Sequence, residues 1–296
     1  QDDGKKAERK RAMKIGGAVF FTDYSMTPAE MGRALEERGF DSLWAPEHSH
    51  IPLSRKSPFP SGGEVPKKYY DVLDPFVALT AAAAATSKLL VGTGVCLVAQ
   101  RDPIQTAKLV ASIDQISGGR FLFGVGNGWN QDEMENHGTV FASRHKLARE
   151  RIEAMKVIWT KSKAEYHGEF VNFDPMMAWP KPVQKPHPPI LVGGAFPFSA
   201  RRALRYGDGW IPHRARKQYD DVFDLMPHFR QMAAEANRDL ASVPVTIWGA
   251  KPDADLLRRD RDGGVSRVII TFESAKLDEV LPEMDKWTAI IRKLDS

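Results

Sequence analysis

Short apolar runs alternate along the chain with longer segments in which apolar residues recur every three or four positions. The short runs are rich in Val, Ile and Leu with little polar–apolar alternation, which is typical of parallel strands buried on both faces. The longer segments have the spacing of amphipathic helices. The clearest apolar helix face lies near the C-terminus and carries Leu277, Val280, Leu281, Met284, Trp287, Ile291 and Leu294.

The strand–helix unit occurs eight times in strict alternation. The predicted strands cover residues 14–21, 40–47, 89–98, 120–126, 189–194, 207–212, 243–250 and 266–272. Thr27, Pro28 and Glu30 predict a capping box at the start of the first helix. Eight such units in about 280 residues predict an α/β fold, specifically a closed (β/α)8 TIM barrel.

Two long segments fall outside this repeat. Residues 48–74 form a Pro- and Gly-rich insert after the second strand. Residues 161–188 contain a predicted hairpin (AEYHGEFVNF) and the run WPKPVQKPHPP, and they precede the fifth strand. Because long loops of a TIM barrel gather at the carboxyl ends of its strands, we expect both segments to shape this mouth and select the substrate.

Composition and charge narrow the possible partners. Of the 296 residues, 42% are hydrophobic, which is enough for a sizeable core. The net charge is +4, and residues 1–12 hold five Lys or Arg against three Asp or Glu, so the remaining chain is only slightly basic. This balance argues against a nucleic-acid partner. We predict that residues 1–12 are a flexible leader or a remnant of an expression vector.

Other features bear on the compartment. No apolar stretch approaches the roughly 18–20 residues needed to cross a bilayer, so no membrane partner is expected. The charged N-terminus lacks the pattern of a signal peptide. Cys96 is the only cysteine, so no internal disulfide can form, and we expect a reducing, cytoplasmic location.

The stretch FLFGVGNGWN, residues 121–130, ends the fourth predicted strand with Gly124, Gly126 and Gly128. A dinucleotide fingerprint would read G-x-G-x-x-G and join its strand directly to a helix. Here the spacing is G-x-G-x-G, and a polar loop over residues 130–143 is expected before the next helix, so a pyrophosphate would meet no helix N-terminus. The glycines instead predict a strand end where the backbone approaches a flat ligand closely.

The segment SGGRFLFGVGNGWNQDEMENHG resembles the bacterial luciferase-like monooxygenase family, and specifically its coenzyme F420-dependent oxidoreductase branch. Four further segments agree in the same order: SLWAPEHSHIP, LLVGTGVCLVAQRDPIQTAK, KPVQKPHPPILVGG and YGDGWIP. The resemblance covers residues 13–212, and the barrel pattern alone extends it over the last three units. It implies that residues 13–296 form one luciferase-like TIM-barrel domain.

The resemblance also implies a cofactor, F420 or alternatively FMN, whose ring lies in the barrel mouth against the third strand. Relatives often have a non-proline cis peptide bond in that strand, and the matching bond is Gly94–Val95. Gly94, Val95 and Cys96 are thereby implied to contact the cofactor ring. The sequence neighbours of Cys96 include no base or cation, which favours a small structural residue there. Asn130 either hydrogen-bonds the cofactor or is a turn residue. Backbone N–H groups implied to hold the cofactor phosphate belong to Gly193, Gly194, Ala195 and Phe196.

Glu47 and His48 end the second strand. The F420-dependent relatives that oxidise alcohols carry an acidic residue followed by histidine here, which implies that His48 contacts the ring or takes a substrate proton. An ordinary histidine pKa of about 6.5 suits either role at neutral pH. Without such a role, the pair would be a loop histidine beside a solvated carboxylate. Glu replaces the more frequent Asp, and a tryptophan of some relatives is missing from Ser49-His50-Ile51-Pro52, which argues against simple alcohols or sugars as substrates.

The predicted function is therefore hydride transfer between F420 and an unidentified small organic substrate. If the cofactor is reduced FMN, the protein would be a monooxygenase that uses O2, and a third alternative is a non-catalytic binding protein for either cofactor. An H-x-H pattern like His48-x-His50 also occurs in metal-dependent hydrolase barrels. The later ligands are incomplete, because strand six offers His213 but strand five ends in Gly-Gly, so no metal is predicted. Relatives commonly dimerise, so a homodimer is expected. A basic track for the acidic tail of F420 could be formed by Arg55, Lys56, Lys67 and Lys68.

Overall fold

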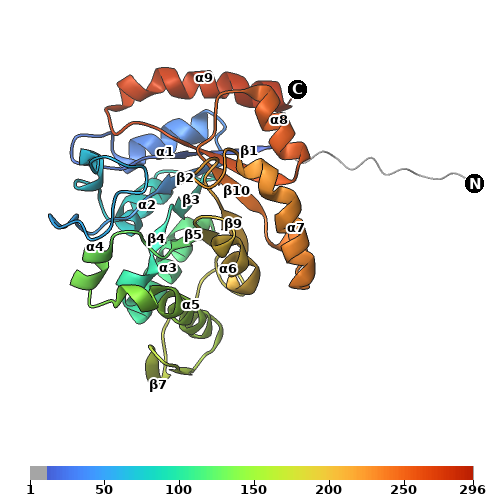
Figure 1. The fold of residues 1–296 in the computed structure, drawn as a ribbon. Coiled ribbons are helices and arrows are strands. Elements are labelled where there is room, and N and C mark those ends of the chain that lie inside the picture. Colours follow the sequence, from blue (N-terminus) through green and yellow to red (C-terminus); the bar gives the residue numbers. More distant parts are fainter. Residues whose placement is uncertain (1–11, 296) are drawn as a thin grey trace, which may run out of the picture.

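A computed structural model describes residues 12–295 as a closed parallel barrel surrounded by helices (Figure 1). The barrel strands, in chain order, are β1 (Lys14–Ala18), β2 (Ser42–Ala45), β3 (Leu90–Thr93) continued by β4 (Cys96–Leu97), β5 (Phe121–Gly126), β8 (Ile190–Gly193), β9 (Gly209–Ile211), β10 (Val245–Trp248) and β11 (Val265–Thr271). Pairing of β1 with β11 and of β3 with β5 closes the sheet on itself. The predicted TIM barrel is confirmed. The predicted leader lies outside the described residues apart from Ala12.

The helices that cover the barrel alternate with these strands. They are α1 (Pro28–Glu37), α2 (Pro75–Ala84), α3 (Pro103–Ser117), α5 (Arg144–Thr160), α6 (Phe198–Tyr206), α7 (Met226–Glu235), α8 (Ala254–Asp262) and α9 (Leu277–Asp295). The predicted capping box of α1 is confirmed, because Glu30 N–H donates to Thr27 Oγ1 and Thr27 N–H donates to Glu30 Oε2. Among residues 12–295, no helix combines the length and apolar character needed to cross a membrane.

The core has two parts, which follow from the alternation of side chains along each strand. Leu122 of β5 and Ile269 of β11 belong to a small cluster inside the barrel, together with Trp44. Their sequence neighbours Phe121 and Val268 belong to the large cluster between the strands and the helices. The barrel interior is therefore a packed core, and the space available to a ligand lies at the carboxyl ends of the strands.

The second long segment does not reach the mouth, contrary to our expectation. It forms the predicted hairpin, β6 (Ala164–His167) and β7 (Asn172–Met176), which Figure 1 shows beyond the end of α5. Gln184 then bonds to Asp114, near the end of α3, and to the carbonyl of Phe121, the first residue of β5. Because residues 161–188 lead from a helix into the amino end of β8, they lie at the opposite end of the barrel from the mouth.

The polar loop expected over residues 130–143 contains a helix, α4 (Gln131–Asn136), and a short 3-10 turn, η3 (Phe141–Ser143). The expectation of an irregular loop is therefore wrong. The segment Gln-Asp-Glu-Met-Glu-Asn carries one apolar residue, Met134, so it shows no helical periodicity. Only the N-cap signal of Asn130 could have revealed the helix.

The glycines of β5 make room for the neighbouring strand segment. A Cβ atom on Gly124 would overlap the carbonyl oxygen of Thr93, and one on Gly126 would overlap the side chain of Val95. A Cβ on Gly193 of β8 would also stand 2.9 Å from Val95. These positions have no side chain because the segment of residues 93–95 packs directly against them. The Val95 side chain fills the space beside Gly126 and Gly193.

We expect Gly124→Ala to destabilise the protein by more than about 3 kcal/mol, because the overlapping group is backbone and cannot turn aside. The control is Gly39→Ala, where φ is +77° and nothing lies within 4 Å of the added atom. Left-handed backbone alone costs about 1–2 kcal/mol there. Denaturant unfolding of both variants measures the difference. Equal losses of unfolding free energy would contradict the predicted overlap at position 124.

Candidate active site

Glu47 and His48 follow β2 at the barrel mouth, and both are buried, with exposed fractions of 5% and 9%. The alternative of a solvated carboxylate beside a loop histidine therefore does not describe this pair. The two side chains bind different partners and therefore have different roles.

Glu47 is held by the segment that follows β4. Its Oε2 accepts a 2.7 Å hydrogen bond from the N–H of Leu97, and its Oε1 accepts from Arg101, which also binds Asp74, the N-cap of α2. Burial raises the pKa of Glu47 above its ordinary value, although the Arg101 charge acts against this. Both carboxylate oxygens are thus hydrogen-bonded within the protein. Glu47 therefore links the end of β2 to the segment after β4, which continues the third barrel strand.

His48 forms a buried pair with Glu133 of α4. His48 Nδ1 lies 2.7 Å from Glu133 Oε2, and Glu133 has no exposed surface. Glu133 also accepts hydrogen bonds from Gln100 Nε2 (3.1 Å) and from the N–H of Ser49 (3.0 Å). Since a carboxylate only accepts, Nδ1 of His48 carries the proton and Nε2 is left as an acceptor. Within the described chain, Nε2 has no hydrogen-bond partner.

The charge of Glu133 follows from its partners. Burial by itself would raise the pKa of this carboxyl, but the hydrogen bonds from His48, Gln100 and the N–H of Ser49 hold it below its ordinary value. Glu133 is therefore ionised at neutral pH. The sequence reasoning missed this residue because it lies in the segment interpreted as a polar loop.

Aromatic side chains surround the His48 ring. Ring centroids of Tyr69 and Trp129 lie 5.3 Å and 5.8 Å from that of His48. Phe59 contacts both of these rings, at 5.3 Å and 5.6 Å. Phe59 and Tyr69 belong to the insert of residues 48–74, so this insert shapes the mouth as expected. Aromatic rings therefore lie beside the imidazole, while Glu133 binds its Nδ1.

The third barrel position has the backbone geometry that the family resemblance implied. The Gly94–Val95 peptide bond is cis. Cys96 beside it is fully buried, and burial together with the nearby Glu47 raises the pKa of its thiol well above the ordinary value. The sulfur is a protonated packing group. A Cβ on Gly94 would overlap the ring of Trp248, so this glycine also makes room for protein atoms.

Asn130 combines the two roles considered for it. Its Oδ1 accepts from the N–H of Glu133 at 3.3 Å, which makes Asn130 the N-cap of α4. Its Nδ2 is buried and has no partner in the described structure. The same holds for Oε1 of Gln100, whose amide nitrogen binds Glu133. Unpaired polar atoms of this kind are uncommon in protein interiors, and here a donor and an acceptor occur around one helix start.

The turn after β8 lies close to two arginines and a histidine. Gly194 has φ of +132°, and a Cβ there would stand 3.6 Å from Nη2 of Arg202 in α6. Arg144 and His145 begin α5, and burial together with the charges of Arg144 and Arg202 lowers the pKa of His145 to about 4. Neither arginine forms an ion pair with the described residues, and each has a buried Nε without a partner. The His145 imidazole is therefore neutral at pH 7, and the positive charge comes from Arg144 and Arg202, which are called the cationic cluster below.

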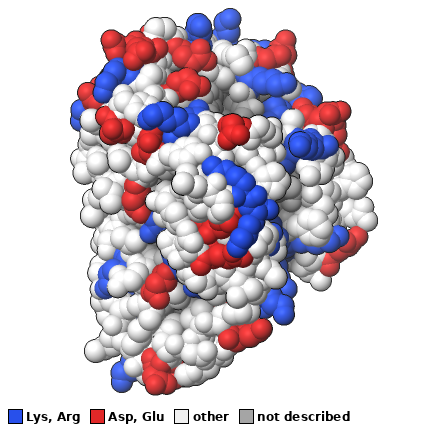
Figure 2. All heavy atoms as spheres, turned by 60° about the vertical axis from the view of Figure 1, so that its left-hand side comes forward, with Lys and Arg blue, Asp and Glu red and all other residues white. Residues whose placement is uncertain are grey.

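The proposed basic track on the insert is largely neutralised. Lys56 pairs with Glu135, Lys67 with Asp71, and Lys68 lies 3.5 Å from Glu273. The Arg55 guanidinium donates to Tyr70 Oη and to backbone carbonyls. Figure 2 views the side that carries the insert, and basic and acidic side chains lie next to one another there.

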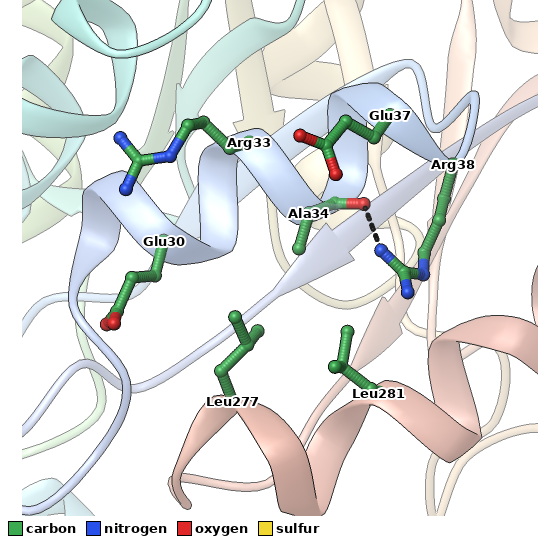
Figure 3. Close-up of a pocket in the computed structure, with 7 residues that line it drawn as sticks. All are labelled: Glu30, Arg33, Ala34, Glu37, Arg38, Leu277 and Leu281. Carbon is green, nitrogen blue, oxygen red and sulfur yellow. Dashed lines mark hydrogen bonds between the residues drawn. The ribbon is translucent and has the colours of Figure 1, made fainter.

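A groove of about 310 Å3 lies elsewhere, between α1 and α9 on the outside of the barrel (Figure 3). The charged side chains that line it, such as Glu30 and Arg33, stand along α1, and Leu277 and Leu281 face them from α9. Since both helices pack on the outer surface of the barrel, this groove is separate from His48 and the mouth.

Comparison with known proteins places the chain in a class of enzymes built on this barrel. The family model described as luciferase-like monooxygenase matches residues 27–251, and the chain belongs to this family. The solved structure of monooxygenase RslO1 from Streptomyces bottropensis superposes with a TM-score of 0.76 at 21% identity, covering 96% of this chain and 100% of that one. This similarity shows the shared fold.

Sequence relatives show which cofactors the family uses. An uncharacterized protein of Mycobacterium tuberculosis is 38% identical over 94% of this chain and 98% of its own length. The F420-dependent hydroxymycolic acid dehydrogenase of the same species is 29% identical over 79% of this chain and 60% of its own. The FMNH2-dependent dimethylsulfone monooxygenase of Pseudomonas putida is 34% identical over 47% of this chain and 40% of its own length. Members of the family are thus oxidoreductases and monooxygenases, and both cofactors occur among the relatives.

We expect the stability lost in Glu133→Gln to depend on pH. The folded protein holds the pKa of Glu133 below the ordinary 4.5, so ionisation stabilises the fold above that value and ceases to do so as pH falls. The difference in unfolding free energy between wild type and variant should therefore shrink from about pH 7 to below about pH 4. Urea unfolding across this range measures it. Glu165→Gln, an exposed glutamate of β6, is the control, and a pH-independent difference at position 133 would contradict the assignment.

Proposed function

We propose that this protein transfers a hydride between coenzyme F420 and a small organic substrate, with His48 handling the substrate proton. The observation that carries the proposal is the buried His48–Glu133 pair. It presents an imidazole whose Nδ1 is fixed as a donor and whose Nε2 remains free to accept a proton. Oxidation of a hydroxyl group needs such an acceptor, because the hydroxyl proton must leave as the hydride leaves carbon.

The residues at the mouth fit a flat redox cofactor with an anionic arm. The buried Nδ2 of Asn130 and Oε1 of Gln100 lack partners, and a ring with carbonyl and N–H groups would supply them. The turn of Gly193, Gly194, Ala195 and Phe196 offers backbone N–H groups, and the cationic cluster beside it offers charge for a phosphate. When bound there, F420 would supply or accept the hydride.

The chain's own residues then manage the proton. In the oxidative direction His48 Nε2 accepts the hydroxyl proton, and the Glu133 carboxylate stabilises the imidazolium through the 2.7 Å hydrogen bond. In the reductive direction the same nitrogen donates to a carbonyl oxygen. Tyr69, Trp129 and Phe59 exclude water from the imidazole and favour an apolar substrate. Glu47, engaged by Arg101 and Leu97, acts in this proposal as a positioning residue.

An FMN-dependent monooxygenase is the second candidate, and two observations favour it. The cationic cluster has no acidic partner within the described chain and would suit a terminal phosphate, which FMN carries. The lysines expected to bind the acidic tail of F420 already pair with Glu135, Asp71 and Glu273. Asn130 and the cationic cluster would hold FMN, which would supply the chemistry with O2 when reduced, and His48 would exchange a proton with the substrate.

Titration of the purified protein with F420 and with FMN should show binding of F420 at lower concentration. Arg202→Ala should raise the dissociation constant about tenfold, because it removes a phosphate contact. Arg205→Ala is the control, since Arg205 is an exposed residue of the same helix. Binding of FMN with no detectable F420 binding would replace the first candidate by the second.

Replacing His48 by Ala should lower turnover by about 10²–10⁴-fold, because the proton acceptor is lost. Cofactor affinity should change little, since His48 is assigned to the substrate. Turnover is measured with the substrate that a screen of apolar alcohols and ketones identifies, and His167→Ala, an exposed histidine of β6, is the control. Loss of cofactor binding without a specific loss of turnover would point to a non-catalytic binding protein instead.

A further inference from the structure

The hydroxyl of Ser49 lies where the buried pair meets a second group of histidines. Ser49 Oγ is 3.4 Å from Glu133 Oε1, 2.7 Å from His137 Nε2 and 2.8 Å from His50 Nδ1. His137 is the C-cap of α4, and the rings of His50 and His137 lie 5.5 Å apart. Ser49 and His137 are exposed, whereas Glu133 is fully buried.

We propose that Ser49 and His137 form the route by which protons pass between the His48–Glu133 pair and solvent. The inference rests on the proposed function, in which His48 takes up or gives away one proton in each cycle. The aromatic rings of Tyr69 and Trp129 flank His48, so a proton it accepts needs another way out. Glu133 is the group that connects the imidazole with the surface.

The hydrogen-bond directions suit such a route. Asn136 Nδ2 donates to His50 Nε2, so His50 Nδ1 carries a proton and donates it to Ser49 Oγ. The Ser49 hydroxyl can then point its own hydrogen either to His137 Nε2 or to Glu133 Oε1. A hydroxyl with two alternative acceptors passes a proton by accepting on one side and donating on the other.

The transfer balances in three steps. His48 gives its Nδ1 proton to the Glu133 carboxyl, and rotation of that carboxyl exchanges its two oxygens. Glu133 then passes a proton to Ser49 Oγ while Ser49 passes its own hydrogen to His137 Nε2. His137 releases a proton from Nδ1 to water, so one proton leaves His48. This passage leaves the remaining protons of His48 and His137 on Nε2, and the reverse passage, in which His48 gives its Nε2 proton away in the reductive direction, restores both to Nδ1.

The charges around His137 favour this role. Burial and the neighbouring His50 lower the pKa of His137, and Arg101 adds to this while Glu133 opposes it. Its imidazole is therefore neutral at pH 7 and ready to accept. Serine alone could not hold the extra proton, since a hydroxyl oxygen takes up a second proton only in strong acid, whereas imidazole can accept a proton near neutral pH and pass it on.

Exchange of the His48 Nδ1 proton with water, followed by NMR in the cofactor-free protein, tests the route. We expect this exchange to be about tenfold slower in Ser49→Ala than in wild type. Ser49→Thr keeps a hydroxyl and should exchange close to the wild-type rate. His137→Gln should also slow the exchange, and it leaves the buried pair untouched should Ser49→Ala disturb folding. Equal exchange rates in wild type, Ser49→Ala and His137→Gln would overturn the proposal.

A second measurement uses the loaded enzyme. Ser49→Ala should lower kcat with little change in KM, and an added imidazole buffer should restore part of it, because the buffer replaces the lost proton carrier. Absence of rescue together with unchanged proton exchange would show that Ser49 only holds the loop to α4. If His48→Ala leaves turnover unchanged, the proposed function fails. The exchange rates in the cofactor-free protein still decide separately whether the route exists.

Discussion

A buried carboxylate must be surrounded by donors, and this requirement on Glu133 organises the barrel mouth. Its donors come from separate parts of the chain: His48 and Ser49 after β2, and Gln100 in the 3-10 turn η2 (Val98–Gln100) after β4. Glu133 itself stands on α4, which follows β5. One side chain therefore holds the carboxyl ends of three barrel positions together and sets the protonation of the histidine between them.

A second buried acid has a complementary task. Glu47 binds the N–H of Leu97 and, through Arg101, reaches the N-cap residue Asp74. Glu47 and His48, which are adjacent after β2, therefore have different roles. Glu47 uses both oxygens to bind the scaffold, whereas the His48 ring keeps one nitrogen free. The fixed position of β2 relative to η2 is what allows His48 to meet Glu133 in one orientation.

The mouth consequently has two chemically different regions. Near β2 it is aromatic and contains the imidazole, with Phe59 and Tyr69 contributed by the insert. Near the ends of β5 and β8 it carries Arg144, His145 and Arg202, which have no acidic partners in the described part of the chain. The two regions differ in charge and in polarity, and relatives in this family depend on FMNH2 or on F420.

The sequence by itself determined the barrel, because eight buried strands and their helices leave periodic signals that depend only on local spacing. It also pointed to His48, Asn130 and the turn after β8, which follow strand ends. It could not reveal Glu133, which is 85 residues from His48 and lies in a short helix without an apolar stripe. The order of the predicted elements already placed residues 161–188 at the amino end of the fifth strand, because they follow a helix and precede a strand, and our expectation that they line the mouth overlooked this. The tertiary structure decided the role of Glu133, because burial and the pairing of a donor with a distant acceptor arise only when separate strand ends are brought together.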